Sequence, residues 1–167
     1  MKKIDIKKSM LKIYPLSEKK SLYPILAYWS YNNWYLHRHV PFNLVLQEYK
    51  RRAEPDSLPC SFIAFWGELP VGMVSVKETD MISRRELSPW LSALYVSPDY
   101  RERGVGTELI RAVFNLCSSR GFKRVFLFID SRFIKALEKF YGNQGWIFLD
   151  MDTDSDGNRT KILFHEL

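Results

Sequence analysis

The chain has 167 residues, enough for one domain with a buried core. Hydrophobic residues make up 46% of it and aromatic residues 15%, a composition that excludes a disordered tail and a fibrous protein. The formal net charge is +6, which suits an anionic ligand as well as an ordinary soluble surface. The basic residues follow no recognisable nucleic-acid-binding motif, so RNA or DNA binding is not the favoured interpretation.

Neither secretion nor a membrane span is indicated. Residues Met1–Tyr14 are rich in lysine and lack the apolar run of a signal peptide. The longest uncharged stretch, Ser21–Leu36, is too short and too polar to cross a bilayer. We therefore expect a cytoplasmic protein without a membrane partner. Cys60 and Cys117 lie far apart in apolar surroundings, so we expect both in the core, with no disulfide and no metal.

In the first half of the chain, the pattern predicts a strand near Leu11–Tyr14 and aromatic-rich helical material that extends to about residue 52. The segment Glu54–Pro59 contains two prolines and predicts a loop. Two β-rich runs around the turn Gly67–Pro70 predict an antiparallel hairpin that ends near Glu78.

In the middle of the chain, Trp90–Val96 predicts a strand after a polar loop, Thr79–Pro89. Apolar residues then recur every four positions from Val105 to Cys117, which predicts an amphipathic helix. The apolar run Val125–Ile129 is typical of a strand covered on both faces. The strand–helix–strand unit predicts a right-handed parallel crossover.

A second helix is expected at about Phe133–Tyr141, followed by a hairpin of Trp146–Met151 and Lys161–Glu166. The turn between these strands, Asp152–Gly157, spells half of an EF-hand calcium loop. The twelfth position is Leu163 instead of Glu, so we expect a solvated turn. Together the elements predict an α/β protein with a mixed sheet, in one domain over residues 1–167.

The most informative segment lies between the strand that ends at Val96 and the helix after it. It carries Arg-x-x-Gly-x-Gly at positions 101–106. Glycine lets the backbone approach a ligand closely, and the first turn of a helix offers unsatisfied N–H donors at the positive end of its dipole. The pattern therefore predicts a phosphate or pyrophosphate site, to which the Arg101 and Arg103 guanidiniums could add hydrogen bonds. The alternative is a Gly-rich helix start with solvated arginines.

The run Val96–Thr107 resembles the acetyl-CoA-binding motif of the GNAT-type N-acetyltransferase superfamily. The segment Ala136–Trp146, a helix ending in Phe-Tyr and followed by Gly and an aromatic, looks like the second signature of that superfamily. The resemblance covers roughly Cys60–Leu167. Within it, the segment Ser88–Val96 looks like that of small bacterial members of the superfamily. It implies a three-layer α/β fold, with a parallel strand–helix–strand core flanked by antiparallel strands. The acetyl-CoA core would be at about 90–146 and acceptor-side helices at about 15–52.

The same resemblance implies roles for individual residues. The strand Leu94–Val96 would splay from Val125–Ile129 and bond the pantetheine arm. Tyr141 would donate a proton to the leaving thiolate. The backbone N–H groups that would hold the CoA pyrophosphate are those of Arg101, Glu102, Arg103, Gly104, Val105, Gly106 and Thr107, and the strand residues are Leu94, Tyr95 and Val96.

The implied reaction is direct transfer of an acetyl group from acetyl-CoA, as co-substrate, to a primary amine on a small molecule or a peptide. The acceptor would lie between the N-terminal helices and the loop Thr79–Pro89. Asp80 and Glu86 are candidates for the general base, as is a water chain, and His37 and His39 are weaker ones. The pattern also departs from the family at Asp130 and Ser131, where an Asn often contacts the cofactor.

Two other functions are left open. One is a non-catalytic module that binds or senses CoA, which would keep the 101–107 site and tolerate loss of Tyr141. The other is a basic RNA-associated protein, whose binding would weaken steeply with salt. A homodimer is also left open, and the sequence does not identify the acceptor.

Overall fold

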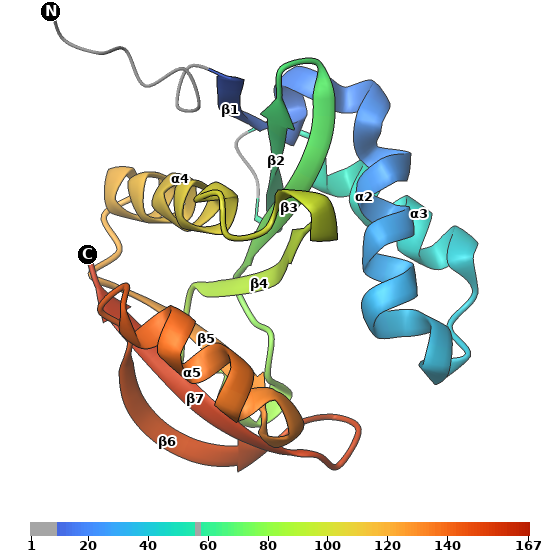
Figure 1. Ribbon diagram of the computed structural model, residues 1–167. Coiled ribbons are helices and arrows are strands. Elements are labelled where there is room, and N and C mark those ends of the chain that lie inside the picture. The colour runs from blue at the N-terminus through green and yellow to red at the C-terminus, as the bar shows by residue number, and fades with distance from the viewer. Residues whose placement is uncertain (1–9, 56–57) are drawn as a thin grey trace, which may run out of the picture. The chain divides into compact units, whose positions relative to one another are not determined.

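The computed structural model describes residues 10–55 and 58–167. Seven strands form a mixed sheet in the order β1-β2-β3-β4-β5-β7-β6 (Figure 1). The helices and strands are β1 (Leu11–Pro15), α2 (Tyr23–Ser30), α3 (Phe42–Arg52), β2 (Cys60–Trp66), β3 (Leu69–Lys77), β4 (Trp90–Val96), α4 (Val105–Ser119), β5 (Arg124–Asp130), α5 (Ile134–Gly142), β6 (Ile147–Thr153) and β7 (Arg159–Glu166).

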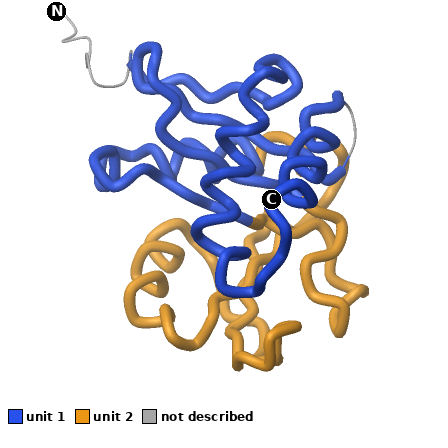
Figure 2. The backbone as a smooth tube through the Cα atoms, turned by 90° about the vertical axis from the view of Figure 1, so that its right-hand side faces the viewer, with its two compact units in different colours: residues 1–76, 93–113 blue, residues 77–92, 114–167 orange. Residues whose placement is uncertain are grey.

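Two compact units make up the chain (Figure 2). The first comprises residues up to 76 together with 93–113, and the second comprises 77–92 and 114–167. The boundary therefore falls before the last residue of β3, inside β4 and again inside α4.

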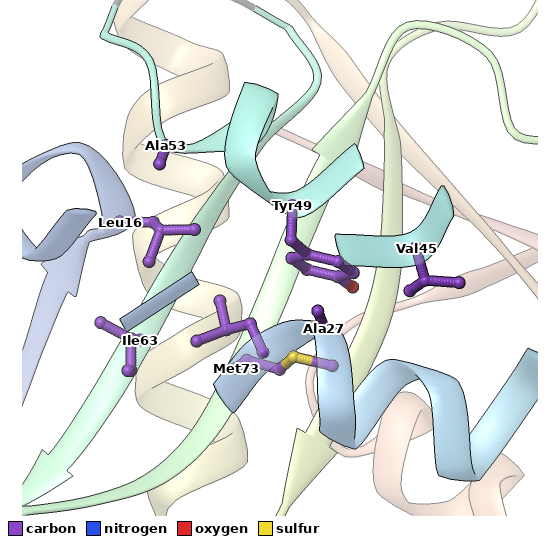
Figure 3. Close-up of a cluster of buried hydrophobic side chains, with 8 residues drawn as sticks. Leu16, Ala27, Val45, Tyr49, Ala53, Ile63 and Met73 are labelled. Carbon is purple, nitrogen blue, oxygen red and sulfur yellow. The ribbon is translucent and has the colours of Figure 1, made fainter. Parts of the chain in front are cut away.

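In the first unit, β1, β2 and β3 pair antiparallel, and α2 and α3 pack on one face of them (Figure 1). The helices bury their apolar faces against Ile63 of β2 and Met73 of β3, which face each other across the strand pair. Burial of this apolar surface is the main stabilising term of the unit. Figure 3 shows the resulting core, which consists of Leu16, Leu26, Ala27, Val45, Tyr49, Ala53, Ile63 and Met73.

A charged side chain lies at the edge of this core. Arg52, at the end of α3, is 1% exposed. Its guanidinium pairs with the Glu48 carboxylate and donates to the Ser75 hydroxyl at 2.9 Å. Ser75 in turn shares a 2.7 Å hydrogen bond with Ser61. Because a buried charge is tolerated only when it is paired and hydrogen-bonded, this network ties α3 to β2 and β3.

The other face of β3 receives the first turns of α4. Gly72 is the contact point: a Cβ built on it would lie 2.8 Å from the Tyr95 carbonyl oxygen, 3.3 Å from Leu109 and 3.4 Å from Val105. Ala64, its partner on β2, is also small and fully buried. Small residues on this face therefore let α4 and β4 approach β3 closely.

In the second unit, β5 and β7 pair antiparallel, and Trp90 of β4 pairs with Phe126 of β5 in parallel. One face of these strands carries a core of Met81, Trp90, Phe126 and Ile162. The opposite face receives α5, since Glu138 of α5 pairs with Lys161 of β7. The predicted parallel strand–helix–strand unit and the predicted C-terminal hairpin are confirmed.

Strand β6 is the last in the order of the sheet. In its second half, two backbone N–H groups donate to carboxylates of the same strand. The N–H of Met151 donates to the Asp150 carboxylate at 2.8 Å. Likewise, the N–H of Thr153 donates to the Asp152 carboxylate at 2.7 Å. Its first half exposes three apolar side chains in succession, Ile147, Phe148 and Leu149.

The other predicted elements agree with the structure within a few residues. Helix α5 ends at Gly142, one residue beyond the predicted end at Tyr141. Of the two cysteines, Cys117 is buried as predicted, whereas Cys60 is partly exposed. No helix within the described ranges is long and apolar enough to cross a membrane. Residues 1–9 of the Lys-rich start, and residues 56 and 57 of the predicted loop, lie outside the described residues.

We predict that Gly72→Ala destabilises the protein by about 1–3 kcal/mol, because the new Cβ would press on the backbone carbonyl of Tyr95. The control is Gly142→Ala, whose Cβ would meet nothing within 4 Å and which lies in a helix, where alanine is favoured by up to about 1 kcal/mol. Urea unfolding measures both changes. Equal free energies of unfolding for the two variants would contradict the close approach at Gly72.

Candidate functional site

The segment that joins β4 to α4 forms a series of tight turns. The N–H of Ser97 donates to the Val71 carbonyl at 2.8 Å, which holds the end of β4 against β3. Pro98–Tyr100 is one 3₁₀ turn, in which the N–H of Tyr100 donates to Ser97 at 2.9 Å. The first bond of α4 runs from the N–H of Glu108 to the Gly104 carbonyl, at 3.1 Å. These bonds fix both ends of the segment Arg101–Gly104.

Positive φ angles within this segment turn its backbone outward. Glu102 has φ 59° and Gly104 has φ 86°. A Cβ on Gly104 would meet nothing within 4 Å, so the space above it is open. In the parts of the chain that the structure describes, the N–H groups of Glu102 to Gly104 donate to no other backbone carbonyl. With the unpaired N–H groups of the first turn of α4, they provide a set of donors for an anion.

The two arginines of the predicted motif act differently. The Nε of Arg101 donates to the Val96 carbonyl at 3.0 Å, so this side chain braces the loop against the end of β4. The backbone N–H of Arg101 donates to Pro98 at 3.2 Å. The guanidinium of Arg103 instead lies over two aromatic rings, those of Trp66 and Tyr100.

The predicted strand residues Leu94, Tyr95 and Val96 all lie in β4 and are half-buried. Directly before them, Ala93 has φ 52°, a left-handed conformation that is strained for a residue with a Cβ. The Tyr95 ring packs on Trp29 of α2, with ring centroids 5.2 Å apart. Ala93 therefore marks an irregularity within β4. It lies next to Leu94–Val96, whose backbone N–H and carbonyl groups are predicted to hydrogen-bond the pantetheine arm of the cofactor.

Gly72 is the residue of this region that the sequence analysis missed. It lies on β3 and contributes no side chain, yet it brings the Tyr95 carbonyl and the first turns of α4 together. The signal was present in the sequence, since a glycine inside the apolar run Val71–Val76 marks a close approach of another backbone.

Tyr141 lies near the end of α5 and is 7% exposed. Its ring packs edge-to-face against Trp146, with centroids 5.9 Å apart, and against Phe140 at 5.1 Å. The backbone closes the helix around it, because the N–H groups of Gln144 and Trp146 both donate to its carbonyl. Burial raises the pKa of the Tyr141 phenol above its ordinary value, so the group stays protonated at neutral pH.

The four candidate bases differ in their surroundings. Asp80 is largely buried and pairs with Lys77 at 2.7 Å. Glu86 is exposed and pairs with Arg84 at 2.7 Å, and the hydrogen bond from Arg84 lowers the pKa of the Glu86 carboxyl. A lowered pKa makes a carboxylate a weaker base. His37 and His39 are exposed, at the last helical turn before α3.

No metal site was found within residues 10–55 and 58–167, where no three His, Cys, Asp or Glu side chains are grouped to hold an ion. Of the EF-hand-like segment, Asp152 and Thr153 end β6, and Asp154–Gly157 lie in the turn between β6 and β7. There the Asp154 carboxylate accepts from the backbone N–H groups of Asp156 and Asn158, at 3.0 and 2.8 Å.

Comparison with known proteins identifies the family of this chain. The family model described as the acetyltransferase (GNAT) family matches residues 18–162. The chain belongs to the GNAT acetyltransferase family. A comparison with curated protein sequences gave no significant match.

Many solved structures share the fold of this GNAT chain, at low sequence identity. An aminoglycoside 6'-N-acetyltransferase in complex with coenzyme A superimposes with a TM-score of 0.71, at 15% identity over 93% of this chain and 96% of its own. Ard1 from Thermoplasma volcanium gives 0.67, at 18% identity over 95% and 98%. A spermidine N-acetyltransferase chimera from Vibrio cholerae and hSSAT gives 0.69, at 14% identity over 94% and 95%.

These findings confirm the predicted family, the mixed α/β fold and the class of enzyme. The protein is a GNAT-type acetyltransferase, which favours catalysis over a non-catalytic CoA-binding module and over an RNA-associated protein. The roles of individual residues stay predictions.

Proposed function

We propose that this acetyltransferase moves an acetyl group from acetyl-CoA directly to a primary amine. The observation that carries the proposal is the outward-turned backbone of residues 101–107, between the end of β4 and the first turn of α4. Coenzyme A presents a pyrophosphate, and clustered N–H donors at the start of a helix suit such an anion. Coenzyme A is bound to the aminoglycoside acetyltransferase of similar fold.

The residues divide into two binding roles. The N–H groups of Glu102 to Thr107 hold the pyrophosphate, and Arg101 braces the loop and adds positive charge. Leu94, Tyr95 and Val96 offer backbone groups to the pantetheine arm, in the manner of an added strand. The strained backbone at Ala93 interrupts the regular strand next to these groups and is consistent with that role.

The chemical step requires two proton transfers. The amine nitrogen attacks the thioester carbonyl, a backbone N–H of β4 stabilises the oxyanion that forms, and the carbon–sulfur bond then breaks. Tyr141 donates its proton to the departing thiolate. The amine must lose a proton first, because an alkylamine with a pKa near 10.4 is neutral in only about one molecule in 2,500 at pH 7. Asp80, Glu86 or a water chain would accept this proton.

The acceptor class rests on the relatives. Two proteins of similar fold are named for an aminoglycoside and for spermidine, and both compounds carry primary amines. We propose a small-molecule or peptide amine for this chain. We also propose that residues 1–167 act as one catalytic domain, since the family match runs through both compact units. The predicted cytoplasmic location and the homodimer stay predictions.

The proposal is tested first by thermal unfolding with acetyl-CoA. A ligand at a hundredfold excess over its Kd stabilises the native state by about 2.7 kcal/mol, which raises the Tm by roughly 5–10 °C for a chain of this size. We expect that rise with acetyl-CoA and little change with ATP. Acetyl transfer to a panel of primary amines, followed by release of free thiol, then gives the activity. No shift and no thiol release at millimolar acetyl-CoA would reject the proposal.

The proposed anion site predicts a difference between two glycines that share the same left-handed backbone conformation. Gly104 and Gly121 have φ 86° and 81°, and a Cβ on either would meet nothing within 4 Å. Alanine at each position should cost about 1–2 kcal/mol of stability, because left-handed φ is unfavourable for it. Only Gly104→Ala should also weaken the binding of acetyl-CoA. We expect its Kd, measured by calorimetry, to rise tenfold or more. If both variants had the same Kd for acetyl-CoA, the loop would not be part of the cofactor site.

The proton donor predicts that Tyr141→Phe lowers kcat at least tenfold, since a positioned acid contributes about 10²–10⁴-fold. Because burial raises the pKa of Tyr141, wild-type kcat should not fall through loss of this proton up to about pH 10. Tyr49→Phe is the matched control: Tyr49 is fully buried, and its hydroxyl has no hydrogen-bond partner within the described ranges. That variant should keep both kcat and Tm. Unchanged turnover in Tyr141→Phe would exclude it as the acid.

A further inference from the structure

The ring of Trp29, on α2, lies against the strand that is proposed to hold the cofactor arm. Its centroid is 5.2 Å from that of the Tyr95 ring on β4, with an interplanar angle of 38°. Both rings are half-buried and pack at the edge of the core of the first unit, as does Ala93. An amine that attacks the acetyl carbon must come close to it, so the atoms attached to that amine lie beside β4. The ring of α2 that contacts β4 is that of Trp29.

The helix that carries Trp29 continues into a π turn, Tyr31–Tyr35. There the N–H of Leu36 donates to the carbonyl of Tyr31, as the wider π geometry requires. Such turns are rare and are frequent at functional sites. The side-chain amide of Asn33 donates to the Trp29 carbonyl at 2.7 Å. Asn33 therefore holds the backbone of Trp29 at the entrance to this turn.

The same segment carries no carboxylate. Between residues 21 and 47 the sequence contains no Asp, Glu or Lys, and its one arginine is Arg38. The guanidinium of Arg38 lies over the Tyr35 ring, 5.9 Å from the centroid. The next carboxylate along the chain, Glu48, pairs with the buried Arg52. Because recognition of a polycation needs carboxylates that pair with its several charges, this segment is unsuited to a polyamine.

We propose that the acceptor of this enzyme is an aromatic monoamine, a primary amine on a short chain attached to a flat ring, and that this ring packs on Trp29. This inference rests on the proposed function and names the class of amine within it. Aromatic rings gain from each other more than the burial of their area alone provides. Trp29 is then a specificity-determining residue, because it contacts the body of the acceptor and not the reacting atoms.

The test compares kcat/KM for three acceptors at saturating acetyl-CoA: phenylethylamine, cyclohexylethylamine and spermidine. The two ring amines carry the same amino group on the same chain, and they differ in whether the ring is flat and aromatic. Wild-type protein should prefer phenylethylamine to cyclohexylethylamine by about threefold or more, because only the flat ring pairs with Trp29. It should prefer phenylethylamine to spermidine by roughly tenfold or more, because the extra charges of spermidine find no carboxylates beside α2.

Three variants show whether Trp29 is responsible. Trp29→Leu keeps an apolar side chain and removes the ring, so the preference for phenylethylamine over cyclohexylethylamine should disappear. Trp29→Phe keeps a ring and should retain the preference. Tyr31→Leu is the matched control, since the Tyr31 ring packs on Phe42 of α3, with centroids 5.3 Å apart. It should keep the wild-type ratio. A general loss of stability lowers both values of kcat/KM and leaves their ratio unchanged.

The inference would be overturned by equal use of the two ring amines, or by a ratio that Trp29→Leu leaves unchanged. It would also fail if Tyr31→Leu lowered the ratio as much as Trp29→Leu does, since the loss of any ring from this segment would then have the same effect. Transfer to spermidine alone would overturn it and leave the proposed function standing. If wild-type protein acetylated none of the three amines, this inference would fail, and the absence of a thermal shift with acetyl-CoA would reject the proposed function as well.

Discussion

The lack of a side chain at Gly72 is the constraint on which the rest of the first unit depends. Strand β3 has helices α2 and α3 on one face and α4 on the other, and only a glycine leaves room for the Tyr95 carbonyl, Val105 and Leu109 at one point. Protein interiors are close-packed and do not absorb an extra methyl group without a shift of their neighbours. The start of α4 is therefore set against the end of β4, and the short connection between them has few conformations left.

That connection reaches its shape through strain that the surrounding bonds hold in place. Glu102 and Ala93 both adopt positive φ, which is unfavourable for residues with a Cβ. The bonds from Ser97 to Val71 and from Arg101 to Val96 fix the backbone between these two strained residues. In its proposed binding role, a loop organised in this way before the ligand arrives would lose little conformational entropy on binding. The same argument applies to the guanidinium of Arg103 on its two rings.

Local patterns explain why so much of the fold could be predicted. The bounds of β4 follow from an apolar run ended by Ser-Pro-Asp, and α4 follows from a four-residue apolar repeat. Contacts between distant residues leave no such pattern, and these were missed. The burial of Arg52 depends on Ser75, and the position of Arg103 depends on Trp66. For Tyr141, the sequence placed the residue on its helix, but its enclosure by Trp146 comes from tertiary packing.

The outer strand β6 affects whether two copies of this protein can associate by pairing their strands. An unpaired strand edge is a template on which another chain can extend a sheet, and this is a common route to aggregation. In the second half of β6 two backbone donors are already occupied by the carboxylates of Asp150 and Asp152. The exposed apolar side chains of this strand lie in its first half, Ile147–Leu149, so a foreign strand would gain apolar contacts there and would find two backbone donors already used beyond it.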